Sequence, residues 1–468
     1  MSTTVTAPRA HRPQPRGLSL LRRELRLLLR TRMAVIALLV LGMLSLAASW
    51  NGARQMDAQR ARIAEAQALQ AESSALVLAR YGASGDAGNL AYHRSVLAWD
   101  EPAALGFTAV GQRDIAPWLM RVRALGLEAQ IYEGEHANAA LALAGRFDFA
   151  FVLVYLAPLV LIALLHDLFS AEREAGRLSL LRALPTAGGG LWWRRAGLRS
   201  ALVLLALCLP VLPFAIHSGA QAAALASLIA LCALYVLFWA GLCLAVASAR
   251  GGSGAHAARL IGLWLLLCLV LPSLGQAALQ RALPVDSGLE LMLAQREEVH
   301  AGWDRPKPET FARFFVDHPE WRDTPPVETR FHWKWYYALQ HAGDLAVREA
   351  SEDYRRRLSQ REQSTHQLGW LLPGVATQAA LHRLAESDLE AHLQFLDRVR
   401  DLHRALRLQL YPYVFEERPW TPADDAGVPV YADSDSAPAS PWLLFAMLAV
   451  WAGLALLAAR HAVLRVAH

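Results

Sequence analysis

The feature that most constrains the fold of this chain is a set of apolar runs long enough to cross a lipid bilayer. Five runs have the length of about 17 to 25 residues that the hydrocarbon core requires, and a sixth near the end is supported by its neighbours. Because an α-helix satisfies its own backbone hydrogen bonds, each run is expected to be a transmembrane helix. The six runs are 33–50, 147–166, 201–217, 222–249, 259–279 and 441–459.

Composition agrees with a chain that is partly embedded in lipid. Hydrophobic residues make up 54% of the sequence and charged residues only 19%, which argues against a soluble protein. All four cysteines lie inside apolar runs, where they are expected to pack, so the segments outside the runs carry neither a disulfide framework nor a thiolate metal site. The first run ends in small residues like a signal peptide, but 32 residues precede it, and we interpret it as an uncleaved anchor.

The distribution of arginine predicts the orientation of the runs. The segments 1–32, 167–200, 250–259 and 460–468 lie on one side of the membrane if there are six spans, and they carry 18 Lys and Arg residues against four acidic residues. The other segments carry 28 basic and 37 acidic residues. Basic loops favour the cytoplasmic side, so both termini are expected in the cytoplasm.

The first 32 residues form a cytoplasmic tail that changes character halfway. Residues 1–17 are rich in Pro, Thr and Arg without apolar periodicity, which is typical of disorder. Residues 18–32 instead alternate leucines at 21, 25, 28 and 29 with arginines, which predicts an amphipathic elbow helix lying on the membrane lipids. The alternative is a plain extension of the first span.

Two long inserts, 51–146 and 280–440, are expected outside the cytoplasm. The first opens with a helix-forming stretch that continues the first span. The second contains two long helical patterns, over 327–363 and 375–411, and one face of the latter holds Leu381, Leu384, Leu389, Leu393, Leu396 and Val399. We therefore expect an all-α membrane protein with six transmembrane helices and two mainly helical extracytoplasmic inserts that form one outer domain, without internal repeats or a strand-rich barrel.

No catalytic motif is apparent. The chain lacks the HExxH, GxSxG, CxxC and GxxxxGK[ST] patterns, so no catalytic residue, metal ligand or cofactor-binding residue is predicted. Most of the sixteen histidines lie in the inserts, but none of these forms an i, i+4 or HxH pair. They are expected to be solvated or hydrogen-bonded, with a metal site assembled by the fold as the alternative.

An aromatic cluster is the most distinctive feature of the second insert. Nine aromatic residues fall within 27 positions and alternate with Arg and Lys. Exposed aromatics beside basic residues could bind a periplasmic protein or other cargo, whereas aromatics at helical spacing usually form a core. The candidate surface residues are Phe331, Trp333, Trp335 and Tyr336.

The segment "DLFSAEREAGRLSLLRALP", 167–185, follows the second run directly. Its acids come first and its bases last, which complements the dipole of a single short helix. Leu178, Leu181 and Leu184 can pack inward, and Pro185 would stop the helix. One interpretation is a hairpin that only returns the chain to the membrane, and the alternative is a segment with a function of its own.

This layout resembles the membrane subunit of an ABC transporter of the ABC-2 type, within the branch described as multicopper-enzyme maturation permeases with large periplasmic inserts. Such permeases show E-x-E-x-G-[ST]-L-x-x-L-L-x-x-P after span two. Glu172, Glu174, Gly176, Leu178, Leu181 and Pro185 match that pattern, and Arg177 departs from it. A weaker similarity lies in "PGVATQAALHRLAESDLEAHLQFLDRVRDLH" before the last run.

The resemblance implies a non-catalytic permease in the inner membrane of a bacterium, which works with an ABC ATP-binding subunit and a second permease, identical or related. ATP and Mg²⁺ would bind the partner and not this chain, and nucleic acid is not a partner. The implied interface with the ATP-binding subunit comprises Asp167, Leu168, Phe169, Glu172, Glu174, Arg177, Leu178, Leu181 and Arg182. Export of a cargo and mechanical work on an outer substrate both remain open. The rival class is a membrane-anchored sensor or scaffold whose outer domain binds a ligand.

Overall fold

The computed structural model describes residues 16–133, 147–183, 190–285, 287–432 and 440–467. Six of its helices are long and apolar enough to cross a membrane, so the chain is a multi-pass membrane protein, as the six runs predict. These spans are α2 (Arg32–Tyr81), α6–η4–α7–α8 (Phe149–Glu174), α10–η5–α11 (Gly190–His217), α12 (Ala222–Ala247), α13–η6–α14 (Ser253–Ala282) and α20 (Trp442–Ala467).

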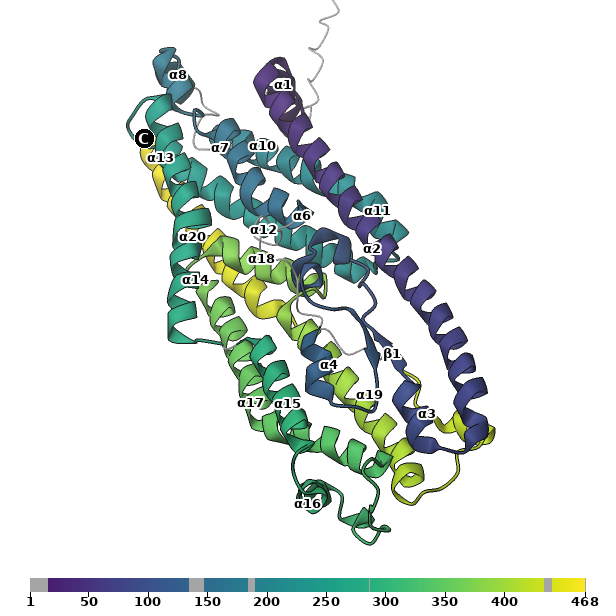
Figure 1. Cartoon of the computed structure of the whole chain (residues 1–468). Coiled ribbons are helices and arrows are strands. Elements are labelled where there is room, and N and C mark those ends of the chain that lie inside the picture. Colours follow the sequence, from purple (N-terminus) through teal and green to yellow (C-terminus); the bar gives the residue numbers. More distant parts are fainter. Residues whose placement is uncertain (1–15, 134–146, 184–189, 286, 433–439, 468) are drawn as a thin grey trace, which may run out of the picture.

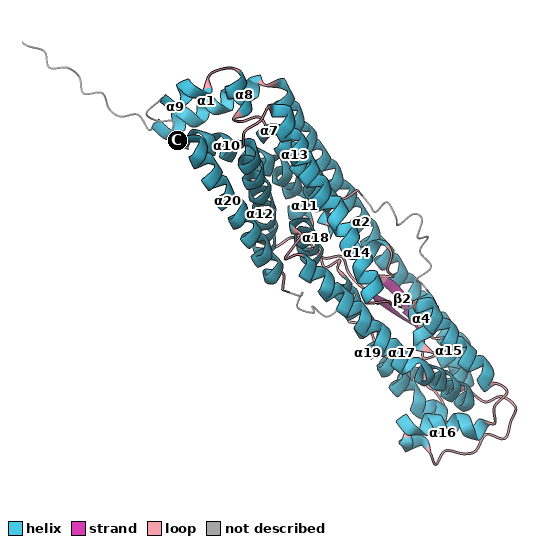
Figure 2. Ribbon diagram, turned by 90° about the vertical axis from the view of Figure 1, so that its left-hand side faces the viewer, coloured by secondary structure: helices cyan, strands magenta, loops and turns pink. Residues whose placement is uncertain are grey.

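The remaining elements are mostly helices that extend the molecule away from the bundle of spans (Figures 1 and 2). The α-helices are α1 (Arg16–Arg30), α3 (Ala87–His93), α4 (Leu127–Glu133), α9 (Leu178–Ala183), α15 (Gly288–Gly302), α16 (Lys307–Asp317), α17 (Trp333–Leu368), α18 (Pro373–Leu384) and α19 (Leu389–Phe415). Short 3₁₀ turns connect them at η1 (Gly82–Ser84), η2 (Gly106–Thr108), η3 (Gly111–Asp114), η7 (Pro319–Trp321) and η8 (Pro422–Gly427).

The first span continues far beyond the bundle. Helix α2 is a single helix of 50 residues, which corresponds to a length of about 75 Å. Its amino-terminal neighbour α1 is a separate helix, because Thr31 adopts an extended conformation between the two. The predicted disordered segment 1–17 lies outside the described residues except for Arg16 and Gly17, which begin α1.

Two segments far apart in the sequence build the part of the molecule outside the bundle, which we call the distal region: the end of α2, α3, α4, the strands, α15–α17 and α19. One of its cores combines Leu90 with Phe314, Tyr337 and Leu410. A second core joins Ile131 to side chains of α15 and α19. The described part of the distal region also contains an antiparallel pair that the sequence pattern did not predict, β1 (Val96–Trp99) and β2 (Leu119–Val122), with Val96 opposite Val122.

The pattern over 375–411 is two helices, and the prediction of one continuous helix is wrong. The chain leaves α18 at Leu384, passes through Glu386 with a φ of 49°, and starts α19 after Asp388, whose carboxylate accepts a hydrogen bond from the backbone N–H of Ala391. A carboxylate at this position satisfies a helix start, so it overrides the leucine periodicity. Leu381 consequently packs in the bundle, whereas the leucines after it in α19 pack in the distal region.

Helix α18 lies at the end of the bundle that faces the distal region (Figure 1), where it packs on α12 and α20. Below its first turn, spans two and five each contain a π-helical turn, η4 (Val152–Leu156) and η6 (Leu266–Val270). The Tyr235 hydroxyl donates to the Val154 carbonyl at 2.9 Å, and the Trp264 indole N–H donates to the Tyr155 carbonyl at 3.1 Å. Side chains from neighbouring spans therefore satisfy carbonyls of the π-turn in span two, as lipid burial requires.

Spans α12 and α20 approach each other at Gly241. A Cβ atom added to Gly241 would lie 2.7 Å from the carbonyl carbon of Ala455 and 2.9 Å from its Cβ. We expect Gly241→Ala to lower the free energy of unfolding by about 1–3 kcal/mol, because two helix backbones must separate. Thermal unfolding of the full chain in lipid nanodiscs measures this effect.

Gly262→Ala is the matched control, since a Cβ at Gly262 would meet none of the described atoms within 4 Å. This variant should unfold at or slightly above the wild-type temperature. Equal unfolding temperatures for the two alanine variants would contradict the close packing of α12 and α20.

Candidate functional site

The segment predicted to contact an ATP-binding subunit lies at the end of the bundle opposite the distal region (Figure 1). The prediction of a single helix there is wrong: α8 ends at Glu174 and α9 begins at Leu178. Gly176 between them has a φ of 68°, a left-handed conformation that disfavours residues with a side chain and ends the first helix. Leu184 and Pro185 lie outside the described residues. We call residues 167–183 the α8–α9 element.

Glu172 connects the α8–α9 element to the third span and to α1. Its carboxylate accepts hydrogen bonds from Arg195 Nη1 at 3.0 Å and from Arg177 Nε at 2.7 Å. Arg195 also donates to Glu24, again at 3.0 Å. The Glu24–Arg195–Glu172 chain thus joins three helices through charge-assisted hydrogen bonds, and its three side chains are each about 15% exposed.

Glu174 connects the same element to the fifth span. Its Oε1 atom accepts hydrogen bonds from the backbone N–H and the hydroxyl of Ser253, at 2.9 Å and 3.1 Å. A carboxylate at the first residues of α13 satisfies free N–H groups and complements the helix dipole. Arg173 reaches the same connection by donating to the carbonyls of Ala249 and Gly251.

The predicted interface residues differ in their exposure. Leu168, Phe169 and Leu178 are buried inside the chain, and the Phe169 ring lies 4.3 Å from the ring of Trp192. They can hold the element in place but cannot reach a partner. Asp167 and Leu181 are half-buried, Glu174 and Arg177 are exposed, and the side chain of Arg182 is not described.

Sequence reasoning missed Leu180 in this element and Arg195 in α10, which binds the element through Glu172. Leu180 is 70% exposed beside Arg177, so the solvent-facing side of α9 is partly apolar. The leucine pattern had indicated only Leu178, Leu181 and Leu184 as packing residues. Arg195 was missed because nothing in the sequence pairs it with Glu172, although Glu24 is the only acid in α1.

The aromatic cluster contributes to both core and surface. Trp335 is buried and meets Trp303 edge-on at 4.7 Å, while Phe331 is exposed and Trp333 and Tyr336 are half-buried. The earlier aromatics Phe314 and Trp321 belong to a core of the distal region. Of the four candidate surface residues, only Trp335 is therefore excluded from direct contact with a partner.

A buried network of histidine, arginine and aspartate lies beside a pocket between α16, α17 and α19. Arg407 donates to Asp344 at 2.9 Å and lies 3.2 Å from Nδ1 of His341. Burial, with the charge of Arg407, lowers the pKa of His341 to about 3 and lowers the pKa of His403 well below its usual value. Within the described residues, no group of three or more His, Cys, Asp and Glu side chains has the geometry to hold a metal ion.

A family model described as a domain of unknown function (DUF3526) matches residues 289–433, which run from α15 past the end of α19 and include α18. No curated protein matches the chain.

We expect Glu172→Ala to destabilise the chain by about 1–2 kcal/mol, because Arg195, whose side chain is 15% exposed, loses a charged acceptor in a poorly hydrated place. Thermal unfolding of the full chain in nanodiscs measures the change. Arg177→Ala removes a mostly exposed side chain from the same cluster and should cost no more than about 0.5 kcal/mol. A Glu172→Ala variant as stable as Arg177→Ala would show that Glu172 does not hold the element.

The low pKa of His341 predicts a pH dependence of stability. The unfolded chain binds a proton at His341 near pH 6.5, and the folded chain only near pH 3, so the stability that neutral His341 contributes is lost as the pH falls through this window. His341→Gln should reduce the fall in unfolding free energy between pH 7 and pH 5 by up to about 1.4 kcal/mol per pH unit. Urea unfolding at several pH values measures the slope, and exposed His300→Gln should retain the wild-type slope.

Proposed function

We propose that this chain is the permease subunit of an ATP-driven ABC transporter of the ABC-2 type. A separate ATP-binding subunit would hydrolyse ATP with Mg²⁺, and this chain would convert that work into export or into mechanical work on an extracytoplasmic substrate. The observation that carries the proposal is the α8–α9 element, which presents an exposed rim while it is bonded to several spans.

The arrangement of charges supports a cytoplasmic location for this element. Helix α1, the α8–α9 element and the carboxyl end of α20 lie at the same end of the molecule (Figure 1). The segments at this end are those with 18 basic and four acidic residues, which favours the cytoplasm of a bacterial inner-membrane protein. The distal region is then extracytoplasmic.

The bonds of the α8–α9 element indicate how a soluble motor would act on the spans. The element is covalently continuous with span two, bonded through Glu172 to span three, and bonded through Glu174 to span five. A force applied to Leu180 and Arg177 is therefore delivered to three spans together. A hairpin that only returned the chain to the membrane would need none of these contacts.

The outer end of the bundle supports mechanical output. Helix α2 is continuous from the membrane into the distal region, and α18 is held between spans while it connects α17 to α19. Movement of the spans would be transmitted by both routes. A second permease would complete the assembly, and the fifth span, the least buried of the six, leaves an apolar face for a partner or for lipid.

The alternative is a membrane-anchored sensor or scaffold, which the large distal region and its pockets favour. A sensor would not recruit an ABC ATP-binding subunit, so the two functions differ in what binds the α8–α9 element.

We expect Leu180→Asp to abolish co-purification of an ABC ATP-binding subunit with the tagged full chain, because a charge replaces the apolar rim that the partner would cover. ATP hydrolysis stimulated by the chain should fall at least tenfold, which corresponds to about 1.4 kcal/mol of lost binding. Mass spectrometry of the purified complex and an ATPase assay measure the two effects.

Leu76→Asp is the matched control, since Leu76 is similarly exposed but lies near the far end of α2. Both variants should unfold at the wild-type temperature. An ATP-binding subunit that remains bound to Leu180→Asp and is stimulated normally would refute this docking element, and the absence of any such subunit from wild-type complexes would favour the sensor.

A further inference from the structure

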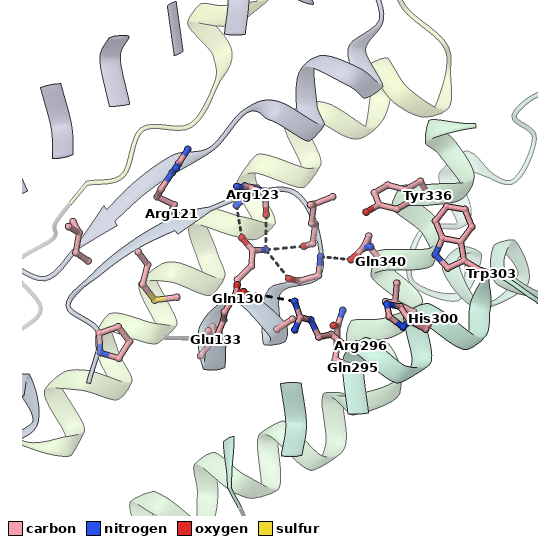
Figure 3. A pocket seen from close by; sticks show the side chains of 18 residues that line it. Arg121, Arg123, Gln130, Glu133, Gln295, Arg296, His300, Trp303, Tyr336 and Gln340 are labelled. Carbon is pink, nitrogen blue, oxygen red and sulfur yellow. Dashed lines mark hydrogen bonds and ion pairs between the residues drawn. The ribbon is translucent and has the colours of Figure 1, made fainter. Parts of the chain in front are cut away.

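A pocket of about 720 Å³ opens in the distal region, between β2, α4, α15 and α17 (Figure 3). It lies outside the α8–α9 element and shares only Tyr336 with the candidate aromatic surface. Its walls combine arginine, glutamine and aromatic side chains from two segments that are far apart in the sequence, 117–133 and 295–340. The pocket therefore exists only because β2 and α4 pack against α15 and α17.

Two arginines line the pocket from β2 and from the residue after it. Arg121 lies in β2 and donates to the Ser95 hydroxyl at 3.2 Å, and Arg123 follows the end of the strand; both side chains are exposed. Arg296 adds a third guanidinium from α15. In Figure 3, Arg121 and Arg123 lie on one side of the pocket, and Arg296 lies on α15 next to Glu133.

The wall below Arg123 is held rigidly. The Gln130 side chain accepts a hydrogen bond from the Arg123 backbone N–H at 2.9 Å and donates to the carbonyls of Arg123 and Gly126, at 3.2 Å and 2.8 Å. Gln340 accepts from the Gly126 N–H at 3.0 Å. These bonds hold the backbone of the turn in place, so a smaller part of the wall has to become ordered when a ligand binds.

Hydrogen-bond donors outnumber acceptors in the lining. Glu133 is the only acidic residue among the described residues of the wall. Its Oε1 atom lies 3.9 Å from Nη2 of Arg296. Arg123 forms no ion pair with any residue in the described parts of the chain. Gln295 is 2% exposed, and its Nε2 atom has no acceptor among the described residues. An anion would supply the charge and acceptors that the wall lacks.

An aromatic wall faces these donors. Trp303 is 49% exposed although Trp335 supports one edge of its ring, and Tyr336 lies 6.2 Å from it between ring centres. In Figure 3 the hydroxyl end of Tyr336 points toward the arginine side. The charge of Arg123 acts on that hydroxyl, since it opposes the rise in the pKa of Tyr336 that burial causes.

We propose that this pocket binds a small anion in which a carboxylate or phosphate is joined to a flat ring. Arg123 and Arg296 would hold the anionic group, since guanidinium groups form paired hydrogen bonds with such oxygens, and Trp303 would cover the ring. The assignment goes beyond the ATP-driven role and does not depend on it, because the pocket and the α8–α9 element share no residue.

Phenyl phosphate is the probe that combines both features, and inorganic phosphate and phenol are its two halves. Calorimetry and saturation-transfer NMR on the full chain in nanodiscs of zwitterionic lipid measure binding without any ATP-binding subunit. We expect phenyl phosphate to bind at least tenfold more tightly than either half. Arg123→Gln, Arg296→Gln and Trp303→Ala should each weaken its binding at least fivefold.

Arg404→Gln is the matched control, because Arg404 is also exposed and lines the other arginine-rich pocket beside α19. It should bind phenyl phosphate as the wild type does. The proposal is overturned if phenol binds as tightly as phenyl phosphate, if Arg404→Gln weakens binding as much as Arg123→Gln, or if Arg123→Gln and Trp303→Ala leave binding unchanged. Arg123 makes no ion pair with the described residues, so Arg123→Gln tests the site even where Trp303→Ala unfolds.

The same measurement in nanodiscs that contain phosphatidylglycerol distinguishes two sources of the anion. Phosphatidylglycerol carries a phosphate but no ring, so competition by this lipid at the site would overturn the recognition of a ring. Unchanged affinity for phenyl phosphate would support a soluble ligand that combines both groups. Loss of the ATP-binding subunit from the complex would leave either result intact.

Discussion

The architecture depends on the contact between α12 and α20, where Gly241 lets two helix backbones meet and α18 packs on both at the end of the bundle that faces the distal region. In lipid the hydrophobic effect does not bring helices together, so close packing and satisfied carbonyls must do so. The Tyr235 hydroxyl and the Trp264 indole N–H satisfy the carbonyls of Val154 and Tyr155. The distal region is attached to the membrane through this assembly as well as through α2.

At the opposite end, charge replaces close packing as the means of joining helices. Glu172, Arg195 and Glu24 connect α8, α10 and α1, and Glu174 caps α13. The two acids that carry the family resemblance thus have intramolecular roles that their sequence pattern does not express. In the proposed permease they would transmit force, and the exposed rim formed by Leu180 and Arg177 would receive it.

The sequence predicted the features that depend on local composition. The six spans follow from the length of the apolar runs. The extension of the first span along the whole of α2 follows from helix-forming residues without a strong break. The division between α18 and α19 depends on Asp388 capping a helix start, and the break after Glu174 depends on Gly176 in a left-handed conformation. The first break competes with an intact leucine period and the second with an acid-first, base-last charge order, so these patterns alone misassigned both. The arginine-lined pocket was not predictable, because Arg123 and Arg296 lie far apart in the sequence and line one pocket only through tertiary packing.

The position of α18 bears on whether transport and mechanical work are alternatives. Its first residues are buried: a Cβ on Gly374 would lie 3.7 Å from the Tyr235 hydroxyl and from a Val154 methyl group, so α18 rests on the π-turn of span two. A substrate path through the bundle would require α18 to move. Only four residues separate α18 from α17 and four from α19, so such a movement would displace both long helices of the distal region. In the proposed ATP-driven cycle, opening the bundle and moving the distal region would therefore be the same event, and the distinction between exporter and mechanical transducer reduces to whether a ligand passes while α18 is displaced.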